Sequence, residues 1–308
     1  MTEQQNAAQP NGTEWASLRD IVYNYLGAVV VVAFAYALYT HHPWLMKFYQ
    51  DQHRVWFAYV ALFYLAILPV YYATLPRGHV GKNRLAVSYV RQCWRRKPTE
   101  PERVAMLTAF IKLFFLPMMV MWLVVHANAV MDYALRFAQH PQFLPTGYWL
   151  LFNLAFFIDV LCFTVGYAVE HPRLGNEIRS VEPTVAGWVV TLACYPPFND
   201  ATVTLLGWPT SDYPNFTTPW VQTMACAVAV VFLAVYASAS IALALKASNL
   251  THRGIVARGP YRWIRHPAYT AKNLSWWIGA LPVIAAQWHV SPSAGILAAL
   301  GMLGWTTL

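Results

Sequence analysis

Apolar stretches of about 20 residues, long enough to cross a hydrocarbon core about 30 Å thick as a helix, recur along this 308-residue chain. Hydrophobic residues make up 58% of the sequence and charged residues only 11%. A soluble globular protein needs more charged surface, and a disordered protein is far less hydrophobic. The sequence therefore predicts an all-α protein, a polytopic transmembrane helical bundle of about 7–8 spans.

A polar N-terminus is expected over 1–20 and a single transmembrane domain over 21–308. The expected spans are 21–40, 55–75, 104–130, 147–169, 184–206, 219–246, 269–289 and 293–308. The fifth contains Pro196 and Pro197, which predict a broken helix or a re-entrant segment. The N-terminus lacks the basic region of a cleaved signal peptide, so the first span is expected to be retained. The last run is short and has no basic flank, as in a chain cut inside its final helix pair.

Lysine and arginine are distributed unevenly between the predicted loops. The net charge of +8 would favour nucleic acid as the partner of a soluble protein. In a membrane protein, basic residues instead flank the cytoplasmic ends of the spans. Because the segments 76–103 and 246–272 hold most of them, both are expected to face the cytoplasm. We expect a multi-pass protein of a bacterial inner membrane or the endoplasmic reticulum, with membrane lipids and no nucleic acid as partners.

The four cysteines do not form a CxxC pair. This spacing argues against a disulfide framework and against a zinc site. Cys162, Cys194 and Cys226 lie in apolar runs, where cysteine usually acts as a small buried side chain. No metal is therefore expected in the functional site.

The most informative segment begins at Ser248 and reads SNLTHRGIVARGPYRWIRHPAYTAKNLSWWIG. Gly259-Pro260 predicts a turn, and Pro267 is suited to the first turn of a helix. Arg265 and His266 would then stand at a helix N-terminus, which attracts anions. Neighbouring tyrosines and tryptophans offer faces for a flat ring or a sulfonium. The alternative is that these residues only anchor the chain at the membrane interface.

The order GxxxxGPYxxxRHPxY, followed by an apolar helix, resembles the isoprenylcysteine carboxyl methyltransferase family and its phospholipid methyltransferase relatives. The resemblance covers roughly residues 248–282. It implies a membrane-bound enzyme that binds S-adenosylmethionine at the cytoplasmic face. The methyl acceptor would be lipophilic and enter from the bilayer, for example as the carboxylate of a prenylated cysteine or a related lipid group.

The resemblance also implies the site residues. Arg265 would be the catalytic residue, which orients the site or holds the cofactor carboxylate. The cofactor would be held by Arg253, Gly254, Ile255, Val256, Tyr261, His266, Pro267, Ala268 and Tyr269. Ala271 stands where the family usually has glycine, and Lys272 stands where an aromatic or apolar residue is common. The family continues into a C-terminal helix with an arginine and glutamates, which has no counterpart before Leu308 and predicts an incomplete cofactor site.

Two other functions remain open from the sequence. Membrane steroid reductases that bind NADPH carry a similar RHPNY-like motif, with asparagine and glutamate where this chain has Ala268 and Lys272. A transporter or structural membrane protein is favoured only by Asp159 and the Pro196-Pro197 break.

Two acidic residues outside the motif are also candidates. Asp159 lies inside an apolar run, where an acidic residue is either functional or paired within the bundle, here with Lys112 or a histidine. Glu170, at the end of the same run, is expected to cap the chain or to contact substrate.

Overall fold

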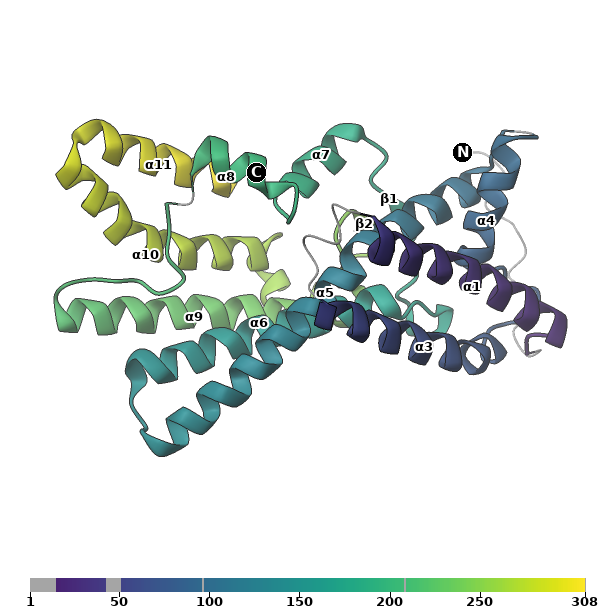
Figure 1. Ribbon diagram of the computed structural model, residues 1–308, viewed down its shortest axis with the longest axis horizontal. Helices are drawn as coiled ribbons and strands as arrows, with labels where there is room; N and C mark the ends of the chain where they lie inside the picture. Colours follow the sequence, from purple (N-terminus) through teal and green to yellow (C-terminus); the bar gives the residue numbers. More distant parts are fainter. Residues whose placement is uncertain (1–14, 43–50, 96, 208, 308) are drawn as a thin grey trace. The chain divides into compact units, whose positions relative to one another are not determined.

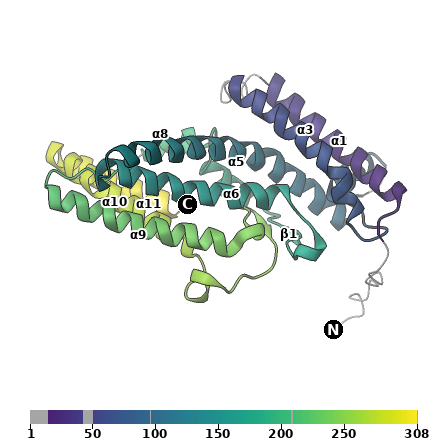
Figure 2. The ribbon, with the colours of Figure 1, turned by 90° about the horizontal axis from the view of Figure 1, so that it is seen from below.

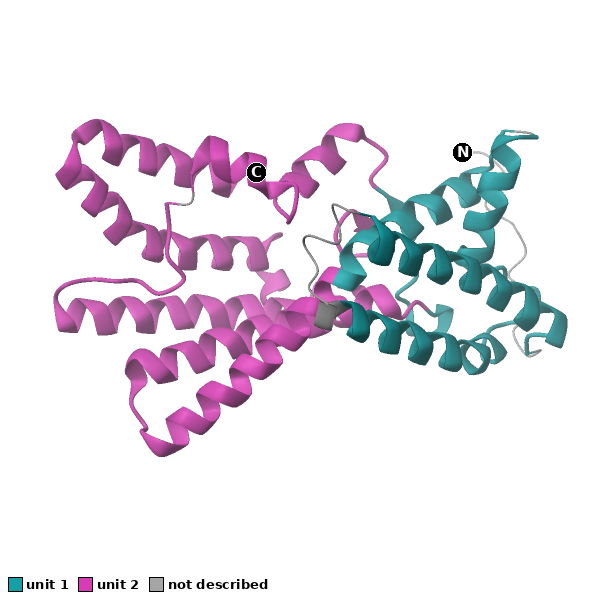
Figure 3. Cartoon of the chain, in the orientation of Figure 1, with its two compact units in different colours: residues 1–117, 171–181 teal, residues 118–170, 182–308 magenta. Residues whose placement is uncertain are grey.

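The computed structural model describes residues 15–42, 51–95, 97–207 and 209–307. Nearly all regular structure in these residues is helical, which confirms the all-α prediction. The chain divides into two compact units, which Figure 3 shows in different colours. Unit 1 comprises residues 1–117 and 171–181, and unit 2 comprises 118–170 and 182–308.

Unit 1 is built on a pair of apolar helices and a shorter polar one. Its elements are α1 (Leu18–His41), α3 (Asp51–Ala73), α4 (Lys82–Cys93), the first part of α5 (Glu100–Gln139), η2 (Pro172–Leu174) and β1 (Ser180–Val181). Helix α1 packs against both α3 and α4. The buried Asn24 of α1 donates to the His79 carbonyl (2.9 Å) and accepts from the Gly81 N–H (2.9 Å). These bonds fix the turn before α4 on the side of α1.

Unit 2 carries the motif segment. Its elements are the rest of α5, η1 (Phe143–Gly147), α6 (Tyr148–Ala168), α7 (Val185–Ala193), α8 (Asn199–Leu206), α9 (Pro219–Leu243), η3 (Ala244–Lys246), β2 (Thr251–His252), η4 (Gly259–Arg262), α10 (Pro267–Val290) and α11 (Pro292–Thr307). Helix α9 packs against both α6 and α10 (Figure 1). Helix α11 lies beside α10 (Figures 1 and 2) and also contacts α8. The segment that precedes α10 lies close to the C-terminal ends of α6 and α9, because η3 contacts α6 and η4 contacts α9.

Small and aromatic side chains form the core of unit 2. Aromatic residues of α6, including Tyr148 and Phe152, pack against Leu233 and Tyr236 of α9. Ala271 of α10, only 3% exposed, belongs to the same core. The methyl group at this position therefore packs inside the helix bundle, where the related family usually has glycine. Close packing of α10 on α9 fixes the orientation of the motif helix.

Five helical segments are long and apolar enough to cross a membrane within the described part of the chain. They are α1, residues 54–73 of α3, α5, residues 143–168 and residues 219–246. The expected runs 269–289 and 293–308 form helices α10 and α11, but their crossing of the membrane stays a prediction. The span 184–206 is not one helix, because Pro196 and Pro197 separate α7 from α8; the predicted break is confirmed. Helix α4, within a predicted loop, was not expected from the apolar pattern.

Glycines allow the closest backbone contacts of unit 2. A Cβ added at Gly279 of α10 would overlap the carbonyl oxygen of Ser211 and lie 2.9 Å from the Thr210 hydroxyl. Thr210 in turn donates to the Trp276 carbonyl of α10 (2.6 Å). The connection between α8 and α9 is thus seated directly on the motif helix.

We expect Gly279→Ala to lower the thermal unfolding temperature in detergent, because the added methyl group forces α10 and residues 210–211 apart. Overpacking of this kind costs about 1–3 kcal/mol. Leu281→Ala on the same helix, where the side chain is 53% exposed, is the matched control and is expected to change stability much less. An equal or smaller effect of the glycine substitution would contradict the close contact.

Candidate functional site

The motif segment is tied to unit 2 from its first residues. The backbone N–H of Asn249 donates to the Tyr167 hydroxyl of α6 (2.7 Å). The Asn249 side-chain amide donates to the Tyr195 hydroxyl, between α7 and α8 (3.1 Å). Gly166 allows the chain to approach this closely, because a Cβ there would overlap the Ala247 carbonyl oxygen. Two tyrosines from separate elements therefore set the course of the loop toward α10.

Arg253 is buried, with only 2% of its surface exposed. Its Nη1 donates to the Leu245 carbonyl (3.3 Å), which closes the loop that follows α9. Burial lowers the pKa of Arg253, and the negative charge of Glu170 opposes that shift. Glu170, predicted to cap the chain or contact substrate, thus interacts with a predicted cofactor residue. The guanidinium has a structural role in the loop in addition to any contact with a ligand.

A second arginine supports the turn before the helix. The Arg258 Nε donates to the Ala242 carbonyl at the end of α9 (2.8 Å). Gly259 adopts a φ of 57°, which favours glycine, and begins the short helix η4. Tyr261 of η4 is partly buried, and burial raises its pKa to about 12, so its hydroxyl stays protonated at neutral pH. The turn therefore contains a partly buried hydrogen-bond donor.

Helix α10 begins at Pro267 with His266 as its N-cap, which confirms the predicted helix start. Proline at this position loses nothing, because the first N–H groups of a helix have no partner within it. Arg265 and His266 are exposed, and the His266 and Tyr269 rings meet edge to face at 6.3 Å. Tyr269 is 63% exposed. Cation, imidazole and phenol thus stand together at an accessible helix N-terminus.

The remaining predicted cofactor residues differ in exposure. Ile255 is 86% exposed, whereas Gly254, Val256 and Ala268 are partly buried. Tyr167 interacts electrostatically with both Arg253 and Tyr269, so it connects the buried and the exposed parts of the motif. The structure thus brings Tyr261, His266 and Tyr269 to one end of the helix bundle, and it gives Arg253 a position inside the loop.

A group of four polar side chains lies between the helices of unit 2. Asp159, Tyr236 and Ser240 are buried and Lys272 is partly buried, and we call these four the polar cluster. Asp159 of α6 is 7% exposed and accepts hydrogen bonds from the hydroxyls of Ser240 and Tyr236 on α9. These two hydroxyls are its hydrogen-bond partners, where the sequence suggested Lys112 or a histidine. His126 of α5 acts on the Asp159 charge, and its own ring hydrogen-bonds Asn153 (3.0 Å).

Lys272 of α10 completes the polar cluster, and it was recognised in the sequence only as a departure from the related family. Its Nζ lies 4.7 Å from the Trp276 ring centroid and 5.8 Å from the Phe156 and Tyr236 centroids. Asp159 and Asp212 act on its charge. Tyr269 and Lys272 are three residues apart on α10 and share a helix face, so the cluster adjoins the motif. The signal in the sequence was a lysine in the first turns of an expected membrane span.

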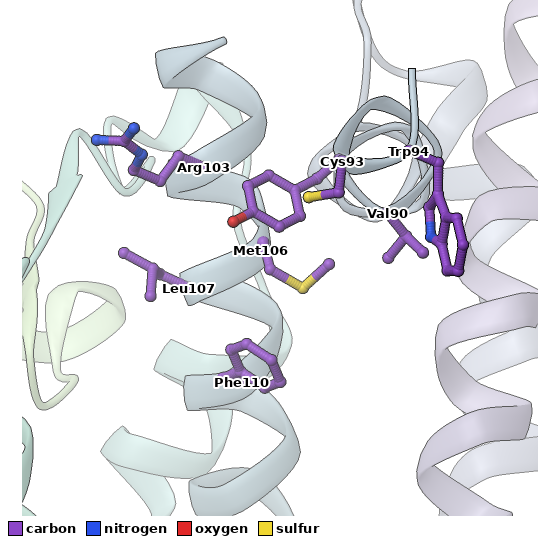
Figure 4. Close-up of a pocket in the computed structure, with 8 residues that line it drawn as sticks. Val90, Cys93, Trp94, Arg103, Met106, Leu107 and Phe110 are labelled. Atoms are coloured by element: carbon purple, nitrogen blue, oxygen red, sulfur yellow. The ribbon is translucent and has the colours of Figure 1, made fainter. Parts of the chain in front are cut away.

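Unit 1 contains a cavity of about 410 Å³ between α4 and α5 (Figure 4). Val90, Cys93 and Trp94 line it from one helix, and Met106, Leu107 and Phe110 line it from the other. In Figure 4 the Arg103 guanidinium points away from the apolar side chains. The cavity is therefore suited to hydrocarbon, but none of the motif residues contributes to it.

The sequence model of the isoprenylcysteine carboxyl methyltransferase family matches residues 220–304. The similarity is confined to this C-terminal segment, and residues 1–219 lie outside the match. The match contains nearly all of α9, the motif loop, α10 and most of α11, so it includes Arg265 and every predicted cofactor residue, but not the candidates Asp159 and Glu170. No curated protein and no solved structure matches the chain.

We expect Ser240→Ala to destabilise unit 2, because the buried Asp159 carboxylate then loses a hydroxyl donor; such losses cost about 1–3 kcal/mol. A double-mutant cycle with Asp159→Asn, followed by thermal unfolding in detergent, measures the coupling. Thr223→Ala, an exposed hydroxyl on the same helix, serves as the control. Additive effects of the two cluster substitutions would show that the bond contributes nothing.

Proposed function

We propose that this chain transfers a methyl group from S-adenosylmethionine to a lipophilic acceptor at the cytoplasmic membrane face. The family match over residues 220–304 carries the proposal, because it includes the whole RHPxY-containing segment. The acceptor we favour is the carboxylate of a prenylated cysteine or a related lipid group. The membrane would be a bacterial inner membrane or the endoplasmic reticulum.

The residues at the start of α10 fit the cofactor chemically. Arg265 is exposed and makes no hydrogen bond or ion pair with any residue that the structure describes, so its guanidinium is available to a carboxylate. The helix N-terminus adds partial positive charge at the same place. His266 and Tyr269 offer a ring donor and a phenol, and Tyr261 offers a second phenol. Gly254 to Val256 and Ala268 would provide backbone and apolar contacts.

S-adenosylmethionine supplies an activated methyl group whose transfer to an oxygen or nitrogen needs no metal. For a carboxylate acceptor, the protein has to align the two reactants and exclude water, and a general base is not required. Arg265 would anchor one end of the cofactor, and the aromatic side chains would hold its rings. An amine acceptor would have to lose a proton first. A carboxylate acceptor therefore requires no proton-accepting residue at the accessible end of α10, whereas an amine acceptor would.

Calorimetric titration in detergent tests the proposal, with S-adenosylhomocysteine and NADPH as the two ligands. We expect saturable binding of S-adenosylhomocysteine and no binding of NADPH. Binding of NADPH alone would make the chain a reductase. A folded sample that binds neither ligand would leave the motif as a membrane anchor and favour the transporter class.

We expect Arg265→Ala to weaken S-adenosylhomocysteine binding by roughly 10- to 100-fold, because a charge-assisted hydrogen bond to the ligand carboxylate is lost. Arg262→Ala is the control, since Arg262 is exposed in the adjacent turn and has no proposed contact. Both dissociation constants come from the same titration. Equal affinities of the two variants would remove Arg265 from the site.

A further inference from the structure

Three aromatic rings lie close to the ammonium group of Lys272. Trp276, Phe156 and Tyr236 hold it at 4.7, 5.8 and 5.8 Å from their ring centroids. Within the part of the chain that the structure describes, Lys272 makes no hydrogen bond and no ion pair. An ammonium carries three donors, and polar groups in protein interiors are normally hydrogen-bonded. Rings compensate the charge but do not accept all three donors.

Neither neighbouring carboxylate pairs directly with this lysine. Asp159 already accepts from the hydroxyls of Ser240 and Tyr236, and Asp212 lies on the exposed connection between α8 and α9. Both interact with Lys272 through space, without a direct ion pair in the described residues. The donors of the partly buried Lys272 are therefore available to another acceptor.

The place of Lys272 on α10 connects it with the proposed cofactor site. It lies one helical turn beyond Tyr269, and Asp159 acts electrostatically on both Tyr269 and Lys272. A sulfonium would be repelled by an ammonium that already fills the aromatic box. A reacting carboxylate would become less nucleophilic if the ammonium bound it. The group best matched to this position is therefore an anionic group of a ligand that takes no part in the methyl transfer.

We propose that Lys272 binds a non-reacting carboxylate or phosphate of the molecules that occupy this site, and that it thereby contributes to ligand specificity. This inference rests on the proposed methyl transfer. The anion is either the amino-acid carboxylate of the cofactor or an acidic group on the lipophilic acceptor. The two sources share the same chemistry, and they are separated by pairs of ligands that differ only in the anion.

The experiment compares wild type and Lys272→Met by calorimetry in detergent with two ligand pairs. The first pair is S-adenosylhomocysteine and its decarboxylated form, S-adenosyl-3-thiopropylamine. The second pair is farnesyl phosphate and farnesol. We expect Lys272→Met to weaken the anionic member of one pair by roughly 10- to 100-fold and to leave its partner almost unchanged. The pair that responds identifies the source of the anion.

Controls separate this role from a structural one. If Lys272 only compensates the charge of Asp159, its removal weakens both members of a pair equally, and that result overturns the inference. Unchanged affinities in both pairs also overturn it. Lys272→Arg keeps the charge and is expected to retain most of the selectivity, and Lys97→Met removes an exposed lysine as the matched control. Thermal unfolding of each variant confirms that it is folded.

Binding of S-adenosylhomocysteine by the wild-type protein tests the proposed function separately. Wild-type protein that fails to bind S-adenosylhomocysteine refutes the methyltransferase proposal and this inference with it. Wild-type protein that binds S-adenosylhomocysteine, together with a Lys272→Met variant of unchanged selectivity, refutes the inference alone.

Discussion

The Asp159 carboxylate lies inside a mainly apolar helix bundle, and its hydrogen bonds connect α6 with α9 in unit 2. An acidic side chain within a membrane helix is costly unless neighbours supply hydrogen bonds or opposite charge. Ser240 and Tyr236 supply the hydrogen bonds from α9, and Lys272 supplies positive charge from α10. The polar cluster thus connects α6, α9 and α10. Helix α10, which carries the motif, packs against α9.

The loop between α9 and α10 is stabilised in the same way, by donors directed at backbone carbonyls. Arg253 and Arg258 each bind a carbonyl in the last turn of α9 or just beyond it, and Asn249 is held by two tyrosine hydroxyls. Of the two arginines expected near a ligand, Arg253 therefore also shapes the loop, as does Arg258, which was not among the predicted site residues. Arg265 is the one whose charge is left for a ligand at the start of α10.

The sequence predicted the features that depend on local rules. Apolar length predicted the long helices, Pro196 and Pro197 predicted the break between α7 and α8, and Pro267 predicted the start of α10. Features that depend on packing could not be predicted. Helix α4 is polar, so no apolar run marked it, and the partners of Asp159 come from α9, 77 to 81 residues later in the chain. Lys272 was visible only as an unusual residue, because its aromatic neighbours Phe156 and Tyr236 belong to other helices.

The segment that matches the family supplies only part of the residues around the site. Tyr261, Arg265, His266 and Tyr269 lie within residues 220–304, as does Lys272. Asp159, Tyr167 and Glu170, which act on Lys272, Tyr269 and Arg253, come from α6 and the residue region after it, outside the match. A shared cofactor would be served by the matched segment, whereas α6 lies outside it. Selection among acceptors is then expected to depend on α6, and Lys272 lies where α6 and the motif helix meet.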